Sequence, residues 1–236
     1  NRLVTVWSGF SLKSYTSLWE DPQLLPAAGL SLQIAAIAAS IALVFGTMCA
    51  YALVRFRRFR GKTILQATVS APLVMPDVIT GLALLLLFVA MQAIIGWPAG
   101  RGFLTIVIAH ATFCTAYVTV VVQSRLTDLD LSLEEAAMDL GATPLRVFFD
   151  ITLPIIAPAL ISGWLLAFTL SLDDLVIASF VSGPGSSTLP MVIFSKIRLG
   201  VAPEVNALAT IIIGIVSVGV LAATILQLRR PKAARS

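Results

Sequence analysis

Long apolar stretches alternate with short polar ones along the chain, and the apolar stretches carry almost no charge. Each has about 20 residues or more, which is the length an α-helix needs to cross roughly 30 Å of hydrocarbon. The pattern predicts five membrane spans, at about residues 27–54, 64–96, 103–123, 155–181 and 206–228. The second span is long, and Pro72 and Pro76 are expected to break it. Because the apolar runs are continuous rather than alternating, a helical bundle is favoured over a β-barrel.

Composition supports a membrane protein. The 236 residues are 58% apolar and 12% charged, whereas soluble domains average about 45–50% apolar and about 25% charged residues. We therefore expect an all-α, polytopic transmembrane bundle, formed by residues 1–236 as one domain. Cys49 and Cys114 fall inside apolar runs, which favours small packing residues over a disulfide framework. The net charge of +4 does not indicate a nucleic-acid partner, because the basic residues cluster at the edges of the spans.

Lysine and arginine are concentrated in three polar segments, which follow the first, third and fifth spans. These segments are residues 55–62, 125–146 and 229–235. The positive-inside rule places all three in the cytoplasm, so the N-terminus lies outside, with Trp7, Tyr15 and Trp19 at the outer interface. If the intact protein begins in the cytoplasm, one further span precedes Asn1, which makes six. The apolar outer segment 182–204 is expected to re-enter the membrane or to lie on its surface.

The polar segment between the third and fourth spans, at about residues 125–154, contains its own helix signals. Ser132 and Glu135 have the spacing of a capping box, in which each side chain bonds the other residue's backbone N–H. Gly141 follows at the position where a glycine ends a helix at low steric cost. The pattern predicts a short helix that ends in a sharp bend.

A second short helix is expected after the bend, with Thr143 as its cap, Pro144 at its first position and its end at or before Pro154. Ala136 and Ala137 on the first helix form a flat surface that another backbone can approach closely. The apolar side chains expected to project beside it are Leu140, Val147 and Phe148. On the residues alone, the segment is either a docking element or a well-capped connector that contacts no partner.

The same segment follows the pattern E-A-A, three residues, G, nine residues, I-x-L-P. The residues that fill it are Glu135, Ala136, Ala137, Gly141, Ile151, Leu153 and Pro154. The pattern resembles the EAA loop of the permeases of bacterial type I, binding-protein-dependent ABC importers. The resemblance implies coupling helices that dock into a groove of a cytoplasmic ATPase. The coupling residues expected from it are Glu135, Ala136, Ala137, Asp139, Gly141 and Pro144.

Two further segments, "APLVMPDVITGLALLLLF" and "GWLLAFTLSLDDLVIASFVSGPGSSTLPM", resemble the putrescine/spermidine branch of these permeases. The resemblance implies a second homologous permease subunit, two copies of the ATPase and a periplasmic polyamine-binding protein, all at the bacterial inner membrane. The chain lacks the G-x-x-x-x-G-K-[ST] spacing of a phosphate-binding loop. We therefore expect no enzymatic activity, cofactor or metal in this chain, with ATP and Mg bound by the partner ATPase.

Acidic residues in or near the apolar spans are candidates for a substrate path. Asp77, Asp173 and Asp174 have no basic residue near them in the same spans. A charged residue in a membrane costs at least about 2.5–3.5 kcal/mol on insertion scales, so it normally faces the bundle interior or water. Carboxylates suit the ammonium groups of a flexible di- or triamine, and apolar or aromatic walls suit its methylenes. Trp164 and Phe168, four residues apart on one helical face, are candidates for such a wall.

Each of these residues also has a purely structural interpretation. Asp77 follows Pro76, so it can occupy the first turn of a new helix, where an acid complements the helix dipole. Asp173 and Asp174 can be structural hydrogen-bonding residues near a bend. His110 lies between two alanines in the third span and is expected to be a packing or hydrogen-bonding residue, since no metal-ligand cluster accompanies it.

Other functions stay open at this point. A permease of the same class for another solute, such as ferric ion, an anion or thiamine, is the nearest alternative, although intramembrane acids disfavour an anion. A secondary transporter usually has inverted repeats with paired broken helices, and no internal repeat is evident. A membrane enzyme is a third possibility, but the chain offers no nucleophile–base or metal constellation.

Overall fold

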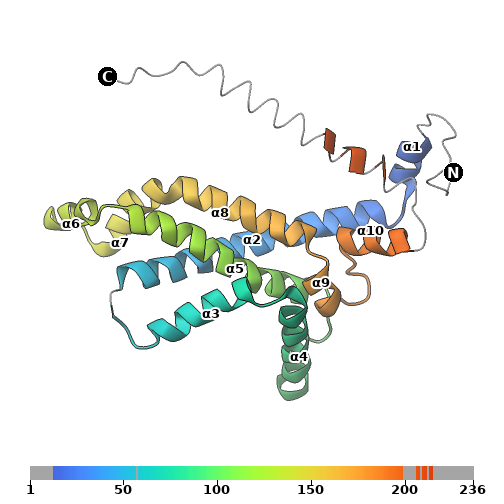
Figure 1. The fold of residues 1–236 in the computed structure, drawn as a ribbon, viewed down its shortest axis with the longest axis horizontal. Coiled ribbons are helices and arrows are strands. Elements are labelled where there is room, and N and C mark those ends of the chain that lie inside the picture. Colours follow the sequence, from blue (N-terminus) through green and yellow to red (C-terminus); the bar gives the residue numbers. More distant parts are fainter. Residues whose placement is uncertain (1–12, 57, 199–205, 208, 212, 215–236) are drawn as a thin grey trace, which may run out of the picture. The chain divides into compact units, whose positions relative to one another are not determined.

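The computed structural model describes residues 13–56, 58–198, 206–207, 209–211 and 213–214, and this part of the chain is helical (Figure 1). The helices are α1 (Lys13–Glu20), α2 (Leu24–Arg55), α3 (Lys62–Val74), α4 (Asp77–Ile95), α5 (Phe103–Asp128), α6 (Leu131–Asp139), α7 (Pro144–Val147), the π-helix η1 (Phe148–Thr152), α8 (Leu153–Asp173), α9 (Val176–Val181) and α10 (Leu189–Arg198). The fifth predicted span falls largely outside the described residues, as does Trp7. The chain divides into two compact units, Asn1–Pro26 with Val192–Ser236, and Ala27–Met191. A single domain over 1–236 stays a prediction.

Within the described ranges, four helical segments are long and apolar enough to cross a membrane. They are Leu24–Arg55, Asp77–Ile95, Phe103–Asp128 and Pro144–Asp173. The first and third predicted spans are confirmed, with ends that extend by a few residues. The fourth begins earlier than predicted and stops at Asp173, because the backbone at Asp174 is extended before the short helix α9.

The second predicted span is two helices rather than one. Pro72 lies inside α3 and does not break it, because the helix has only two residues beyond it and so loses little backbone bonding. The break occurs at Met75 and Pro76, whose backbones are extended. Figure 1 shows α4 turned away from the line of α3. The structure thus confirms that Pro76 precedes a new helix with Asp77 in its first turn.

Helix α5 is the centre of the unit Ala27–Met191. It packs along α8 and also contacts α3 and α9, while α9 packs on α4. Small residues allow α2 to approach α5 closely: a Cβ added at Gly46 would lie 2.7 Å from Cγ1 of Val118. The alanines of α2 that are fully buried are Ala35, Ala38, Ala39, Ala42 and Ala50. In membranes, contacts between small residues give helices close packing without a hydrophobic driving force.

Three threonine hydroxyls of α5 are satisfied inside their own helix. Thr112, Thr115 and Thr119 of α5 each donate to the carbonyl four residues earlier, at 2.6–2.7 Å. Such bonds let a polar side chain lie in an apolar bundle without a second partner. These threonines therefore do not by themselves indicate a polar path.

The unit Asn1–Pro26 with Val192–Ser236 contains an ion pair between Asp21, which precedes α2, and Lys196 of α10. Burial alone would raise the pKa of the Asp21 carboxyl. The hydrogen bond from Lys196 and those from the backbone N–H groups of Gln23 and Leu24 outweigh burial and lower this pKa below its ordinary value. The pair joins two segments that are far apart in the sequence.

Candidate functional site

The short helix α6 begins with a different cap from the one predicted. Its N-cap is Asp130, whose carboxylate accepts the backbone N–H of Ser132 at 3.0 Å. The predicted capping box is wrong, because the helix starts before Ser132 and places that residue within its first turn. The hydrogen bonds from the Ser132 backbone and side chain lower the pKa of Asp130 below its ordinary value.

The end of α6 is the predicted one. Gly141 has a φ of 89°, in the left-handed region that glycine adopts at low cost. Its N–H donates to the Met138 carbonyl at 2.9 Å, and the Ala142 N–H donates to the Ala137 carbonyl at 3.0 Å. These two bonds form a Schellman motif, which satisfies carbonyls at the end of the helix and turns the chain sharply.

The second helix of the loop was predicted to end at or before Pro154, but it continues past this residue. Pro144 occupies its first position, but the side chain of Thr143 makes no capping bond. Helices α7, η1 and α8 run as one apolar helical segment over Pro144–Asp173. The backbone bonds one residue further than in an α-helix across η1, where the Leu153 N–H donates to the Phe148 carbonyl. This wider turn accommodates the proline ring, which would clash in a regular helix.

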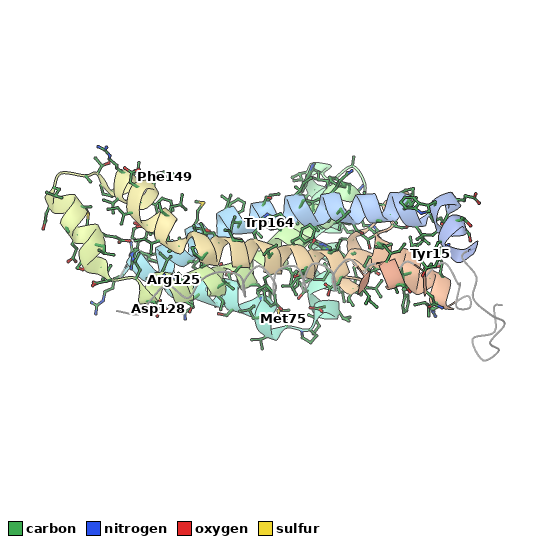
Figure 2. The ribbon with its side chains drawn as sticks, turned by 90° about the horizontal axis from the view of Figure 1, so that it is seen from above. Tyr15, Met75, Arg125, Asp128, Phe149 and Trp164 are labelled. Atoms are coloured by element: carbon green, nitrogen blue, oxygen red, sulfur yellow. The ribbon has the colours of Figure 1, made fainter. Side chains whose placement is uncertain are left out.

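The loop exposes the residues expected to couple. Those largely open to solvent are Glu135, Ala136, Asp139, Gly141 and Pro144, and Ala137 is half-buried. The apolar side chains beside them differ from the predicted set: Leu140 is 91% exposed, Leu145 73% and Phe149 59%. Val147 is instead buried, and Phe148 packs edge-on against Tyr51 of α2, with ring centroids 5.2 Å apart. Figure 2 shows Phe149 at the same end of the bundle as Arg125 and Asp128.

A buried ion pair holds this loop to the bundle, and sequence reasoning missed it. Arg55, the last residue of α2, donates to the Glu134 carboxylate from Nη2 at 2.9 Å and from Nε at 3.3 Å. The Thr152 hydroxyl donates to the same oxygen at 2.7 Å. The one available signal was the adjacent pair Glu134 and Glu135, since neighbours on a helix point about 100° apart and cannot share a face. Arg55 of the first predicted basic segment thus bonds Glu134 of the second, and Figure 2 shows Arg125 at the same end of the bundle as Phe149. The third basic segment, residues 229–235, lies outside the described residues.

Asp174 is not a free carboxylate. It lies at the break between α8 and α9, where it accepts the backbone N–H groups of Ile177 at 3.2 Å and Ala178 at 2.7 Å. His110, fully buried on α5, contacts it through Nε2 at 3.1 Å and contacts Ser171 through Nδ1 at 2.7 Å. The structural alternatives for Asp174 and His110 are therefore confirmed, and the neighbour of Asp174 comes from another predicted span, on α5. The two residues lie 64 positions apart, so only packing could bring them together.

Among the other path candidates, the aromatic pair and Asp173 lie on different faces of α8. Asp77 and Asp173 are both exposed. Trp164 and Phe168 stack, with ring centroids 5.2 Å apart and planes 15° from parallel, and the Trp164 indole N–H donates to the Ser40 hydroxyl of α2 at 3.2 Å. On a regular helix, however, Trp164 and Asp173 point about 180° apart. The stacked rings thus face α2, while the Asp173 carboxylate faces another way.

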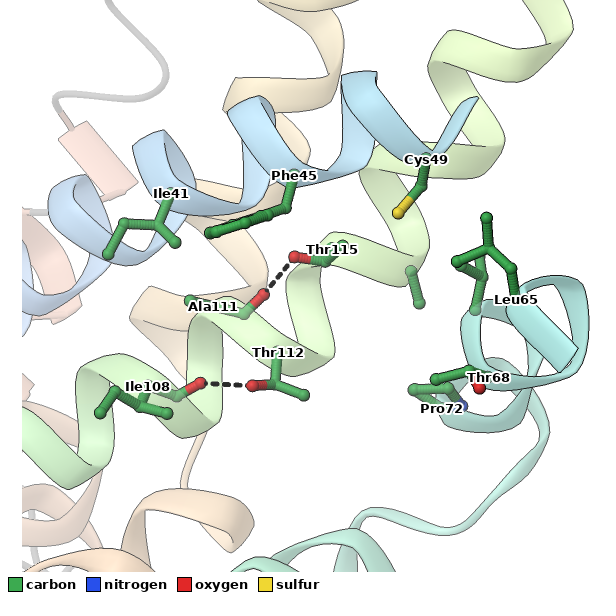
Figure 3. Close-up of a pocket in the computed structure, with 12 residues that line it drawn as sticks. Ile41, Phe45, Cys49, Leu65, Thr68, Pro72, Ile108, Ala111, Thr112 and Thr115 are labelled. Carbon is green, nitrogen blue, oxygen red and sulfur yellow. Dashed lines mark hydrogen bonds between the residues drawn. The ribbon is translucent and has the colours of Figure 1, made fainter. Parts of the chain in front are cut away.

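A cavity of about 420 Å³ lies between α2, α3 and α5 (Figure 3). Its lining includes Phe45, Cys49, Leu65 and Pro72 but no charged side chain. None of the path candidates lines it. In the part of the chain that the structure describes, no three His, Cys, Asp or Glu residues form a potential metal-binding group.

Comparison with known proteins identifies the family. The family model described as "Binding-protein-dependent transport system inner membrane component" matches residues 3–232. The chain belongs to this family. It is a permease of the type I ABC-importer class, with several helices able to span a membrane, and is thus a multi-pass integral membrane protein.

Curated relatives of this permease match nearly its whole length. The putrescine transport system permease protein PotI of Escherichia coli (strain K12) is 66% identical over 218 residues, which cover 92% of this chain and 78% of the relative. The spermidine/putrescine transport system permease protein PotC of Haemophilus influenzae is 44% identical over 207 residues, covering 88% and 78%. PotC of Escherichia coli (strain K12) is 40% identical over 226 residues, covering 96% and 83%.

Solved structures show the same fold at low sequence identity. An inward-facing structure of the MetNI methionine ABC transporter matches with a TM-score of 0.69 and 15% identity, covering 90% of this permease and 97% of that chain. A bacterial ABC transporter involved in the import of alginate matches with a TM-score of 0.70 and 16% identity, covering 97% and 86%. These likenesses confirm the predicted class of fold.

Proposed function

We propose that this permease is a transmembrane subunit of an ATP-driven polyamine importer that carries putrescine or spermidine. The observation that supports this most strongly is the 66% identity to a putrescine permease over 92% of the chain. A second homologous permease completes the path, and a periplasmic polyamine-binding protein delivers the amine. Two copies of a cytoplasmic ATPase bind ATP and Mg, and the complex lies in the bacterial inner membrane.

The EAA loop is the proposed docking site for the ATPase. Glu135, Ala136 and Asp139 are exposed while Glu134 beside them is buried, so α6 presents one face outward and anchors the other. Leu140, Leu145 and Phe149 add an exposed apolar surface around Gly141. Exposed large apolar side chains next to polar ones are typical of a protein–protein contact. Closure of the ATPase dimer displaces this loop, and the helices rock between inward-open and outward-open packings.

Asp77 and Asp173 are the proposed carboxylates of the amine path, because both are exposed. Trp164 and Phe168 provide an aromatic surface for methylenes at a separate place on α8. Asp174 has a positioning role: it caps α9 and fixes the bend next to Asp173. An amine then meets the two carboxylates and the aromatic rings in succession rather than in one pocket.

Transport by the reconstituted complex tests this function. Proteoliposomes that contain both permeases, with ATPase and ATP inside and binding protein outside, should take up labelled putrescine. Unlabelled spermidine should compete, whereas an anion should not. An ATPase variant that binds but does not hydrolyse ATP is the matched control and should abolish uptake.

Two outcomes would contradict the proposal. Uptake that persists without ATP and disappears with a protonophore would indicate a secondary transporter. ATP hydrolysis stimulated by another cationic solute, with no polyamine uptake, would indicate a permease of the same class for that solute.

A further inference from the structure

The side chains of Glu134 and Arg55 together connect four helical segments beneath the docking loop. Oε1 of Glu134, on α6, accepts bonds from Arg55 of α2 and from Thr152 of η1. Nη1 of Arg55 also donates to the carbonyl of Leu126 on α5, at 3.3 Å. We name Arg55, Glu134 and Thr152 the anchor cluster.

The anchor cluster is closed to water. The side chains of Arg55 and Glu134 are only 9% and 8% exposed, and Thr152 and Leu126 are fully buried. Separating a buried carboxylate from its cation leaves both charges without compensation, which is strongly unfavourable. We therefore expect displacement of α6 to carry its partners along.

The position of the cluster suits it to transmit movement. Glu134 precedes Glu135, so one side of α6 meets the proposed ATPase surface while the other holds the cluster. Only Leu129 and Asp130 separate α6 from α5, so the helix has no long linker to absorb a displacement.

Through Thr152 the anchor cluster includes the helical segment Pro144–Asp173. Thr152 is the last residue of η1, where the wide π turn passes into α8. At the same place, Phe148 packs on Tyr51 of α2. A wide turn has fewer regular hydrogen bonds to break, and π-helical turns often occur at functional sites.

We propose that Arg55, Glu134 and Thr152 are positioning residues that transmit displacement of α6 to α2 and α8, and so couple ATP hydrolysis to solute movement. This inference deepens the proposed function and rests on it. The cluster itself contacts neither solute nor nucleotide. Its loss should raise the number of ATP molecules hydrolysed per solute transported rather than stop either process.

The test measures ATP hydrolysis and putrescine uptake in the same proteoliposomes, with the whole complex. Glu134→Gln keeps the size of the side chain and removes its charge, and should raise the ratio of ATP hydrolysed to putrescine transported about 3- to 10-fold. Thr152→Val keeps the ion pair and removes one hydroxyl, and should raise the ratio about 2- to 3-fold. This second variant preserves the test if Glu134→Gln assembles poorly.

A double variant tests whether the residues act as one link. Arg55→Gln combined with Glu134→Gln should be no worse coupled than the more affected single variant, because contacting residues in one network show non-additive effects. Matched controls lie in the last turn of α5, before α6 begins. Thr127→Val removes an exposed hydroxyl that bonds only within its helix, and Asp128→Asn neutralises an exposed acid. Both should leave the ratio unchanged.

Two results separate the possibilities. A ratio equal to the wild-type value in both Glu134→Gln and Thr152→Val would overturn the coupling role. This includes the case in which hydrolysis and uptake fall in proportion, because the cluster would then be only a structural anchor. If wild-type complex hydrolyses ATP with binding protein but moves no polyamine, the proposed substrate fails instead, and that result appears in the wild-type arm alone.

Discussion

Substitution of Gly141 should weaken the bend of the coupling loop in proportion to the cost of a left-handed backbone. Its φ of 89° is accessible to glycine, while the space around it is open, with nothing within 4 Å of an added Cβ. Steric clash with neighbours is therefore absent, and the cost comes only from the backbone conformation. A left-handed residue costs most amino acids about 1–2 kcal/mol.

The order of three variants follows from this single cause. Asn tolerates the left-handed region, so Gly141→Asn should have the smallest effect. Gly141→Ala should cost about 1 kcal/mol, and Gly141→Val more, because a β-branched residue is an outlier there. A cost of about 1–2 kcal/mol shifts the equilibrium between the closed Schellman end and an opened one by about 5- to 30-fold.

Hydrogen exchange of the α6 amides in the purified complex measures this opening, and uptake per ATP hydrolysed measures its consequence. Gly100 is the matched control: it also has open space around it, but its φ is not in the left-handed region, so Gly100→Ala should change neither quantity. The reasoning is refuted if Gly141→Val exchanges no faster than Gly141→Asn. Normal transport by Gly141→Val in spite of faster exchange would refute the coupling role of the bend but not its conformational cause.

Three further predictions follow from the described contacts. Asp174→Asn should lower the melting temperature of the complex, because weaker bonds to buried donors cost about 1–3 kcal/mol. Asp173→Asn should keep the melting temperature and reduce polyamine uptake, and two variants with the same effects in a thermal melt and an uptake assay would contradict these separate roles. Gly46→Ala should destabilise the bundle through the 2.7 Å approach of its Cβ to α5, while Gly29→Ala, in open space on the same helix, should be neutral or stabilising in the same melt. The pKa of Asp130 is lowered from 3.8, so the stabilisation that Asp130 gives α6 is complete above pH 3.8 and is lost as pH falls through the lower folded pKa. Hydrogen exchange of the α6 amides against pH should show this loss, and the same pH-dependent loss in Asp130→Ala would contradict the cause.

The sequence predicted most of the local structure of the loop but not its anchoring. Gly141 itself sets the bend and Pro144 itself sets the helix start, because glycine and proline act through their own backbone angles. The capping box was wrong because Asp130 competes for the same helix start, and an aspartate two residues earlier is an equally good cap. The end predicted at Pro154 was wrong because a π turn at Phe148–Thr152 relieves the proline clash.

For the candidate substrate path, too, the sequence could not predict the contacts between helices. Apolar runs identified the helices that contain Asp173 and Asp174, but they gave no sign of which acid is buried. Adjacent residues on a chain can face opposite environments, and the bend between α8 and α9 turns Asp174 inward and leaves Asp173 exposed. The bend is held by His110, which belongs to another helix.

The sequence by itself determined that this chain is a helical membrane protein with an EAA-pattern loop between two spans. Span length, the charge of the flanks and the EAA spacing are local properties, and each follows from the free energy of a short segment in lipid or water. Only the tertiary structure decided which acids are available and how the loop is attached. Arg55 lies 79 positions from Glu134, and His110 lies 64 from Asp174. Such pairs form because packing buries charges and polar groups that must then find a partner, and no local pattern specifies which partner that is.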